Sequence, residues 1–244
     1  MMPALPASWH VGRVARRRQE TASAVRLELD VPTWPGNLAG SHLDVRLTAP
    51  DGYQAVRSYS AASSGVAKQV VLVVDELPTG EVSPYLVHQL AEGDELEVHG
   101  PLGRFFVWVP SEPDPSPVQL IAGGSGVVPL FAIATARERE AEHVEFRLLY
   151  SVRTPGDVFF ADELAALSRT AVDIVYTRAA PAGESRPPGR LTREAVADLV
   201  IPASAAPRIF VCGPTSFVEA VVDWLVELGH DPARIRTERF GGIG

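Results

Sequence analysis

A proline-rich segment at residues 111–117 divides the chain into two halves with different patterns. Three of its seven residues are proline, which neither a helix interior nor a central strand tolerates. Short β-prone runs precede it, whereas apolar runs alternate with segments of helical spacing after it. We therefore predict two domains, residues 1–112 and 118–244, because 244 residues suffice for two modest hydrophobic cores.

The first half predicts a small antiparallel β-barrel. One helix is expected among the strands, with Ser83 as its N-cap, Pro84 at its first position and Gly93 at its end. Many short strands with a single helix are typical of such barrels. The predicted strands cover residues 9–18, 24–31, 42–48, 54–60, 69–75, 95–99 and 104–108.

The second half predicts an α/β domain, in which a parallel sheet is covered by helices on both faces. Ligands of such sheets bind beyond the carboxyl ends of the strands. The predicted strands cover residues 118–122, 146–151, 172–177, 208–212 and 235–240, and the predicted helices 130–140, 162–167, 192–200 and 215–228.

Two local sequences of the first half suit a phosphorylated, planar ligand. In Arg57-Ser58-Tyr59-Ser60 a guanidinium can pair with a phosphate, an aromatic ring can stack on a planar ring, and a hydroxyl can polarise a ring nitrogen. Gly80-Glu81-Val82-Ser83 precedes the predicted helix, whose first N–H groups can bind a phosphate. A strand with exposed Arg and Tyr, and a simply capped helix, are the alternatives.

A third local sequence, Gly123-Gly124-Ser125-Gly126, connects a predicted strand to a helix in the second half. Its glycines would let the backbone approach a pyrophosphate closely. Val127 occupies the position where the hydrolase pattern G-x-S-x-G needs glycine, and no histidine has the sequence context of a base. A dinucleotide site is therefore favoured over a serine hydrolase.

Taken in order with Cys212-Gly213-Pro214 and Glu238-Arg239-Phe240, these sequences resemble the ferredoxin–NADP⁺ reductase superfamily of flavin enzymes over nearly the whole chain. The resemblance implies that Arg57 pairs with the flavin phosphate, Tyr59 stacks on the isoalloxazine and Ser60 lies near flavin N5. It also implies that FAD is bound, with FMN less expected. The remaining flavin-binding residues would be Ser58, Gly80, Val82, Ser83 and Phe240.

In the second half, the resemblance implies that the glycine-rich turn holds the dinucleotide pyrophosphate. Cys212 would lie near nicotinamide C4 and Glu238 near the reacting rings, so that Ser60, Cys212 and Glu238 are the candidate catalytic residues. Phe240 would cover the flavin, although Gly241 to Gly244 follow it and core packing is an alternative. NADPH is expected rather than NADH, because relatives bind the adenosine end at the positions of Ser151, Arg153, Arg178 and Arg190.

The implied reaction passes a hydride from NADPH to the flavin and then single electrons to a separate ferredoxin, flavodoxin or oxygenase component. A reductase of free flavin or another small acceptor is one alternative. A non-catalytic flavin-binding redox sensor or regulatory subunit is another.

Composition further limits the ligands, the cysteine chemistry and the cellular location that we expect. A formal net charge of −8 argues against nucleic-acid binding. Cys212 is the single cysteine, so the chain is expected to form no internal disulfide and to ligate no iron–sulfur cluster. No metal ligands are expected among the site residues. We expect a cytoplasmic protein with no membrane span, because no signal-peptide core and no run of about 18 uncharged apolar residues is present.

Overall fold

The computed structural model describes residues 7–110, 114–139 and 144–240, and the chain divides into two compact units, Met1–Val109 and Pro110–Gly244. The dividing point lies beside the proline-rich segment, of which residues 111–113 fall outside the described residues.

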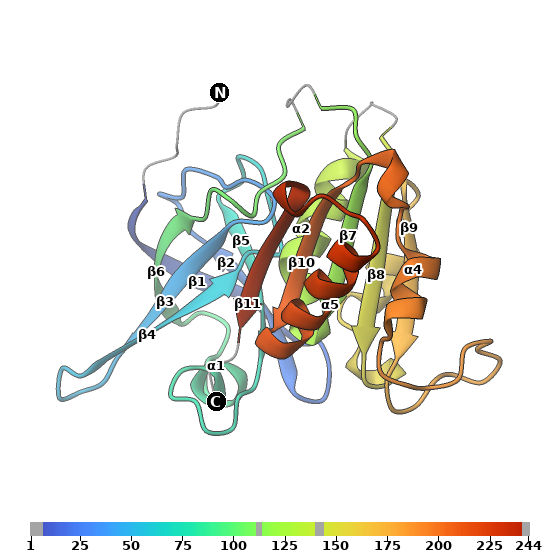
Figure 1. Cartoon of the computed structure of the whole chain (residues 1–244). Helices are drawn as coiled ribbons and strands as arrows, with labels where there is room; N and C mark the ends of the chain where they lie inside the picture. The colour runs from blue at the N-terminus through green and yellow to red at the C-terminus, as the bar shows by residue number, and fades with distance from the viewer. Residues whose placement is uncertain (1–6, 111–113, 140–143, 241–244) are drawn as a thin grey trace. The chain divides into compact units, whose positions relative to one another are not determined.

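The first unit is an antiparallel sheet of six strands in the order β4-β3-β6-β1-β2-β5 (Figure 1). An isolated bridge between Ala61 and Leu72 links the chain just after β4 to β5, so the two edges of the sheet meet. The antiparallel barrel predicted from the sequence is therefore confirmed. The strands are β1 Ser8–Gln19, β2 Ala24–Asp30, β3 His42–Thr48, β4 Gln54–Ser60, β5 Gln69–Asp75 and β6 Glu95–Leu102.

The core of this unit follows from strand alternation and one glycine. In β3, Leu43 and Val45 are buried while their neighbours His42, Asp44 and Arg46 are only partly so, as expected when alternate side chains face opposite sides. Trp34 is fully buried, and a Cβ at Gly100 would lie 2.9 Å from its ring. Glycine at this position therefore lets β6 pass directly against Trp34.

The predicted strand at residues 104–108 is wrong. Trp108 forms only an isolated bridge with Ala39. Gly103 has φ +90°, a left-handed backbone conformation that turns the chain after β6. The side chains of Phe106, Val107 and Trp108 are buried, but the segment makes no ladder of strand pairs.

The helix of the first unit, α1 Ser83–His88, is shorter than predicted, and Gly93 lies in the turn that follows it. Ser83 is also not the N-cap, because Val82 takes that position and Pro84 is the second helical residue. The Ser83 hydroxyl instead accepts a hydrogen bond of 3.0 Å from the backbone N–H of Leu77. This hydrogen bond joins the two ends of the loop that precedes the helix.

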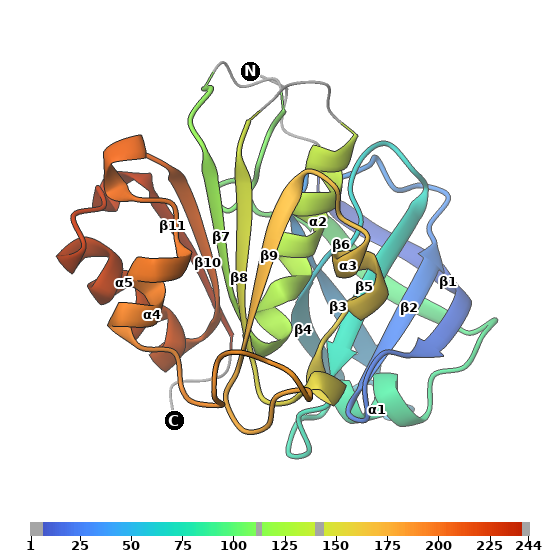
Figure 2. The ribbon, with the colours of Figure 1, turned by 90° about the vertical axis from the view of Figure 1, so that its right-hand side faces the viewer.

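The second unit is a parallel sheet in the order β11-β10-β7-β8-β9. Figure 2 shows α4 and α5 on one face of it and α2 and α3 on the other, as the α/β pattern predicts. The strands are β7 Val118–Gly123, β8 Phe146–Val152, β9 Thr170–Tyr176, β10 Arg208–Pro214 and β11 Ile235–Phe240, and the helices α2 Val127–Glu138, α3 Ala161–Ala165, α4 Arg193–Leu199 and α5 Thr215–Glu227.

The helix boundaries of this unit differ from prediction by a few residues. Helix α2 begins three residues earlier than expected, because Pro129 lies within its first turn, where no intrahelical N–H is needed. Thr192 caps α4 as predicted, and its Oγ1 accepts a hydrogen bond of 3.2 Å from the backbone of Ala195. Short 3₁₀ turns complete the unit: η1 Gly124–Gly126, η2 Pro155–Asp157, η3 Ala203–Ala205 and η4 Pro232–Arg234.

One buried and one exposed ion pair allow us to predict how removal of a charge changes the free energy of unfolding. Arg26 and Glu20 meet at 2.7 Å with side chains only 8% and 6% exposed. Changing Glu20→Gln should lower the free energy of unfolding by about 3 kcal/mol, since it leaves a buried guanidinium without its counter-charge. Urea denaturation followed by circular dichroism measures the loss.

The exposed pair between Arg193 and Glu227, 3.0 Å apart with side chains 43% and 58% exposed, provides the control. Glu227→Gln should cost less than about 1 kcal/mol, because solvent screens this pair. Equal losses for Glu20→Gln and Glu227→Gln would contradict the assignment of the Arg26–Glu20 pair as a buried, stabilising contact.

Candidate functional site

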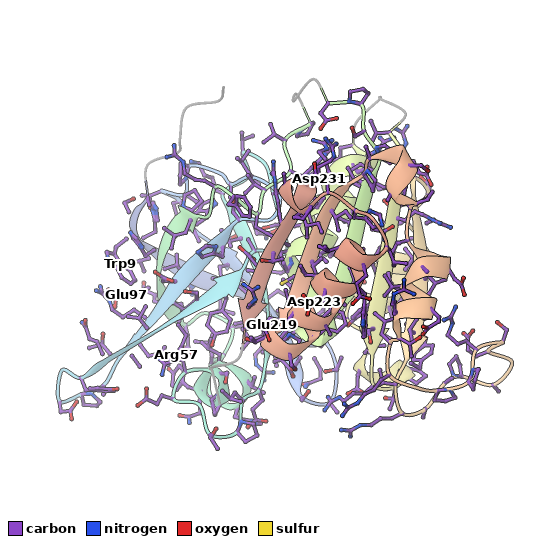
Figure 3. All side chains as sticks on the ribbon, viewed as in Figure 1. Trp9, Arg57, Glu97, Glu219, Asp223 and Asp231 are labelled. Carbon is purple, nitrogen blue, oxygen red and sulfur yellow. The ribbon has the colours of Figure 1, made fainter. Side chains whose placement is uncertain are left out.

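The two predicted phosphate-binding sequences of the first unit lie together. Arg57, on β4, places its Nη2 3.0 Å from Oε2 of Glu81, which belongs to the Gly80–Ser83 sequence. The hydroxyl of Tyr53 donates to the other oxygen of the same carboxylate at 3.1 Å. The fold therefore brings a guanidinium to the loop before α1, as Figure 3 lets the reader follow from the labelled Arg57.

Tyr59 lies two residues after Arg57 and so faces the same side of β4. It packs, partly buried, against the core cluster of the first unit. Burial raises the pKa of its phenol to about 12, and the nearby Arg57 opposes this rise only in part. A tyrosine phenol is neutral at physiological pH with or without this shift, and the partly buried ring suits stacking on a flat aromatic ligand.

The two serines of this strand have different surroundings from Arg57 and Tyr59. The Ser58 hydroxyl donates to Oδ1 of Asp44 at 2.6 Å, and Asp44 is its cross-strand neighbour on β3. Alternation puts Ser58 on the opposite side of the sheet from Arg57, so the structure does not bring it to the phosphate-binding residues. Ser60 is half-buried at the carboxyl end of β4.

The Gly80–Ser83 sequence forms a tight loop. A Cβ on Gly80 would lie 3.0 Å from the carbonyl oxygen of Leu77 and 3.2 Å from Oγ of Ser83. Val82 is fully buried and anchors the start of α1. A cation, a compact loop and a neutral aromatic ring on one side of the sheet fit a phosphorylated flavin.

The predicted dinucleotide turn of the second unit lies between β7 and α2. Gly124 has φ +54°, and a Cβ there would meet nothing within 4 Å, so its backbone is open to a ligand. A Cβ at Gly126 would lie only 2.2 Å from the carbonyl oxygen of Cys212. Gly126 therefore serves close packing against β10, while the half-exposed Ser125 lies between the two glycines.

Phe217 is a site residue that the sequence reasoning missed. A Cβ at Gly123 or at Gly213 would lie 2.7 Å from its ring, so the ring rests on both glycines. The sequence signal for this contact was the position of Phe217, three residues after Pro214 and in the first turn of α5. The ring holds the glycine-rich turn and the end of β10 side by side.

Cys212 and Glu238 are brought together as register partners across β10 and β11. Cys212 is 2% exposed, and burial, with a smaller contribution from the Glu238 carboxylate, raises the pKa of its thiol far above the usual value. The thiol therefore stays protonated and is no nucleophile. The predicted alternative of core packing for Phe240, the partner of Pro214, is not supported, because this side chain is 37% exposed.

The arginines expected at the adenosine end gather where β8 and β9 end. The backbone N–H of Arg178 donates to the carbonyl of Arg153 at 2.9 Å, and Gly189, next to Arg190, donates to Tyr176 at 3.0 Å. Ser151, buried, pairs in register with Gly123.

Arg153 also has an acidic partner that the sequence reasoning missed. Its Nη2 lies 2.7 Å from Oδ1 of Asp157, and Oγ1 of Thr154 donates to Oδ2 at 2.6 Å. The spacing of four residues between Arg153 and Asp157 was the signal, although it spans a 3₁₀ turn rather than an α-helix.

Among residues 7–110, 114–139 and 144–240 no cluster of three His, Cys, Asp or Glu side chains could hold a metal ion. No helix formed by these described residues is long and apolar enough to cross a membrane. Residues 241–244, considered above with Phe240, fall outside the described part of the chain.

Comparison with known proteins matches both units. The model of the oxidoreductase FAD-binding domain matches residues 13–107, and that of the oxidoreductase NAD-binding domain matches residues 120–223. The glycine betaine monooxygenase reductase subunit of Chromohalobacter salexigens is 32% identical over 213 residues, which are 85% of this chain. The chain spans only 56% of that relative's length.

NADH-cytochrome b5 reductase 1 of Lodderomyces elongisporus is 31% identical over 216 residues, which cover 86% of this chain and 70% of the relative. Among solved structures, the ferredoxin reductase in carbazole 1,9a-dioxygenase superposes with a TM-score of 0.81 at 26% identity, covering 98% of this chain and 71% of that one. The flavohem-like FAD/NAD binding domain of nitric oxide dioxygenase from Vibrio cholerae gives a TM-score of 0.82 at 25% identity, covering 96% and 99%.

The resemblance inferred from the five short sequences is thereby confirmed. The FAD-binding match covers the unit that carries Arg57 and Tyr59, and the NAD-binding match covers the glycine-rich turn and Cys212. The chain belongs to the ferredoxin–NADP⁺ reductase superfamily of FAD- and pyridine-nucleotide-binding oxidoreductases.

Proposed function

We propose that this chain is an NAD(P)H-dependent flavoprotein reductase that delivers electrons to a separate protein, an oxygenase component, a ferredoxin or a flavodoxin. The observation that carries the proposal is the approach of Arg57 to the Gly80–Ser83 loop within the FAD-binding domain. Bound FAD would supply the conversion between a two-electron donor and a one-electron acceptor.

In the first unit the proposed roles follow from charge and burial. Arg57 neutralises the flavin phosphate with a guanidinium that stays positively charged at every physiological pH. Tyr59 presents a partly buried, neutral aromatic ring for stacking. Ser60 supplies a hydroxyl at the carboxyl end of β4, where a single donor can orient a ring nitrogen.

In the second unit the backbone does most of the binding. The open backbone of Gly124 and the start of α2, which is twelve residues long, offer N–H groups to a pyrophosphate. Cys212 holds a neutral thiol beside the Glu238 carboxylate, so it shapes the position of the nicotinamide ring without exchanging a proton. Positioning, rather than acid–base chemistry, is then the main catalytic contribution.

The proposed acceptor is an oxygenase component. The glycine betaine monooxygenase reductase subunit and the reductase component of propane 2-monooxygenase from Mycolicibacterium smegmatis, 28% identical over 216 residues, support this choice. The single cysteine suits a reducing compartment, and the cytoplasm is the proposed location.

NADPH is the proposed donor because backbone hydrogen bonds bring Arg153, Arg178 and the neighbour of Arg190 to the ends of β8 and β9. NADH is a second candidate, and one observation favours it: the Asp157 carboxylate already neutralises Arg153 at 2.7 Å. A guanidinium with an acidic partner attracts a 2′-phosphate less strongly than an unpaired one.

Replacement of Arg57 tests the flavin site. Arg57→Ala should lower the flavin affinity about tenfold or more, because a charge-assisted hydrogen bond to phosphate is lost. The ratio of flavin absorbance to protein absorbance in the purified variant measures occupancy. Arg46→Ala is the matched control, since Arg46 pairs with Glu97 at 2.6 Å on the other side of the same sheet. Full flavin occupancy in Arg57→Ala would remove Arg57 from the phosphate site.

Replacement of Cys212 tests the positioning role. Cys212→Ala should slow flavin reduction about tenfold in anaerobic stopped-flow experiments while the circular dichroism spectrum stays unchanged. The ratio of the wild-type rate to the Cys212→Ala rate should not vary between about pH 6 and 9. Burial raises the pKa of the thiol and keeps it neutral throughout this range. A rate equal to that of the wild type would make Cys212 a packing residue only.

A further inference from the structure

The Arg57 guanidinium, on which the proposed flavin site depends, already has two partners in the first unit. Its Nη2 lies 3.0 Å from the Glu81 carboxylate, and its Nη1 donates to the carbonyl oxygen of Val56 at 2.8 Å. The Glu81 side chain is held in turn by Tyr53, whose hydroxyl donates to the second carboxylate oxygen. Both oxygens of Glu81 are therefore engaged at the phosphate-binding residues.

Glu81 lies inside the predicted phosphate loop, not beside it. It directly follows Gly80 and precedes the buried Val82, so the loop fixes the position of its backbone. The side chains of Arg57 and Glu81 are about half exposed, 53% and 51%, so solvent screens their attraction and the pair can separate at small cost. A carboxylate held this way can leave the guanidinium when a stronger anion arrives.

A flavin phosphate and the Glu81 carboxylate need the same guanidinium face. A phosphate accepts paired N–H bonds from arginine and carries more negative charge than a carboxylate. Its arrival beside Glu81 would place like charges close together, and the carboxylate must move away from Arg57 or weaken the phosphate contact. Neutralising Glu81 removes both the competition and the repulsion.

We propose that Glu81 competes for Arg57 and thereby weakens binding of the phosphate group of the flavin nucleotide. This inference rests on the proposed flavin role of Arg57. It adds a specificity-determining residue to that site, because the competition acts on the phosphate and not on the isoalloxazine ring. Flavins with a phosphate should respond to Glu81, and riboflavin, which has none, should not.

The experiment measures dissociation constants of FAD, FMN and riboflavin for the flavin-depleted 244-residue chain by quenching of flavin fluorescence. In Glu81→Gln, FAD and FMN should bind about three- to tenfold more tightly than in the wild type, and riboflavin should bind equally. Amide for carboxylate preserves the shape of the side chain, removes its charge and replaces one acceptor oxygen by an NH2 donor.

Two further variants make the measurement specific. The gain should vanish when Glu81→Gln is combined with Arg57→Ala, because the competition acts through Arg57. Glu97→Gln is the matched control: it removes the same charge from an arginine pair of the same sheet, and it should leave flavin affinity unchanged. Figure 3 shows Glu97 beside Trp9 and away from Arg57.

If the wild-type protein binds FAD but Glu81→Gln binds it equally or more weakly, the proposed function still holds and the inference about Glu81 is overturned. An equal gain for riboflavin, or a gain that persists without Arg57, would also overturn it. Failure of the wild-type protein to bind either FAD or FMN would refute the proposed function itself, and the role of Glu81 with it.

Discussion

The close approach of the glycine-rich turn to strand β10 is the constraint on which the nucleotide-binding unit depends. Any side chain at position 126 would place its Cβ 2.2 Å from the Cys212 carbonyl oxygen, a separation that no adjustment of a flexible group relieves. Phe217 adds a second restriction, because its ring occupies the space that Cβ atoms of Gly123 and Gly213 would need. Together these contacts leave Gly124 open to a ligand and place Cys212 directly behind the turn.

In both units an arginine predicted to bind phosphate has an acidic partner close by. Arg57 pairs with Glu81, and Arg153 pairs with Asp157. Each pair has an arginine about half exposed, so neither contributes much to the stability of its unit. Under the proposed function their effect falls on ligand binding, where a neighbouring carboxylate would lower the attraction of the guanidinium for a phosphate. On this proposal the charges of the binding residues set the affinity for the ligand, while glycines and buried strands set the shape of the site.

The order and type of the elements could be predicted from the sequence, because hydrophobic period and turn residues are local signals. The placement of the glycines at 123 to 126 and of Cys212 followed from strand ends in a parallel sheet, whereas the pairing of Cys212 with Glu238 was seen only in the structure. Residues 104–108 were wrongly predicted to be a strand, because β-prone residue types do not show that the chain turns at Gly103. Ser83 was wrongly predicted to be the N-cap, because its hydroxyl accepts a hydrogen bond from the backbone of Leu77 instead. The partners of Arg57 and Arg153 depend on contacts that residue types alone do not specify.

Anaerobic reduction of the flavin-loaded protein tests the central claim most directly. Purified protein would be saturated with FAD, freed of excess flavin and mixed with NADPH or NADH while absorbance near the flavin maximum is recorded. The account predicts that the yellow colour bleaches within seconds with at least one of the two dinucleotides. A protein that stays colourless with added FAD, or stays yellow with excess NADPH and NADH, would contradict it.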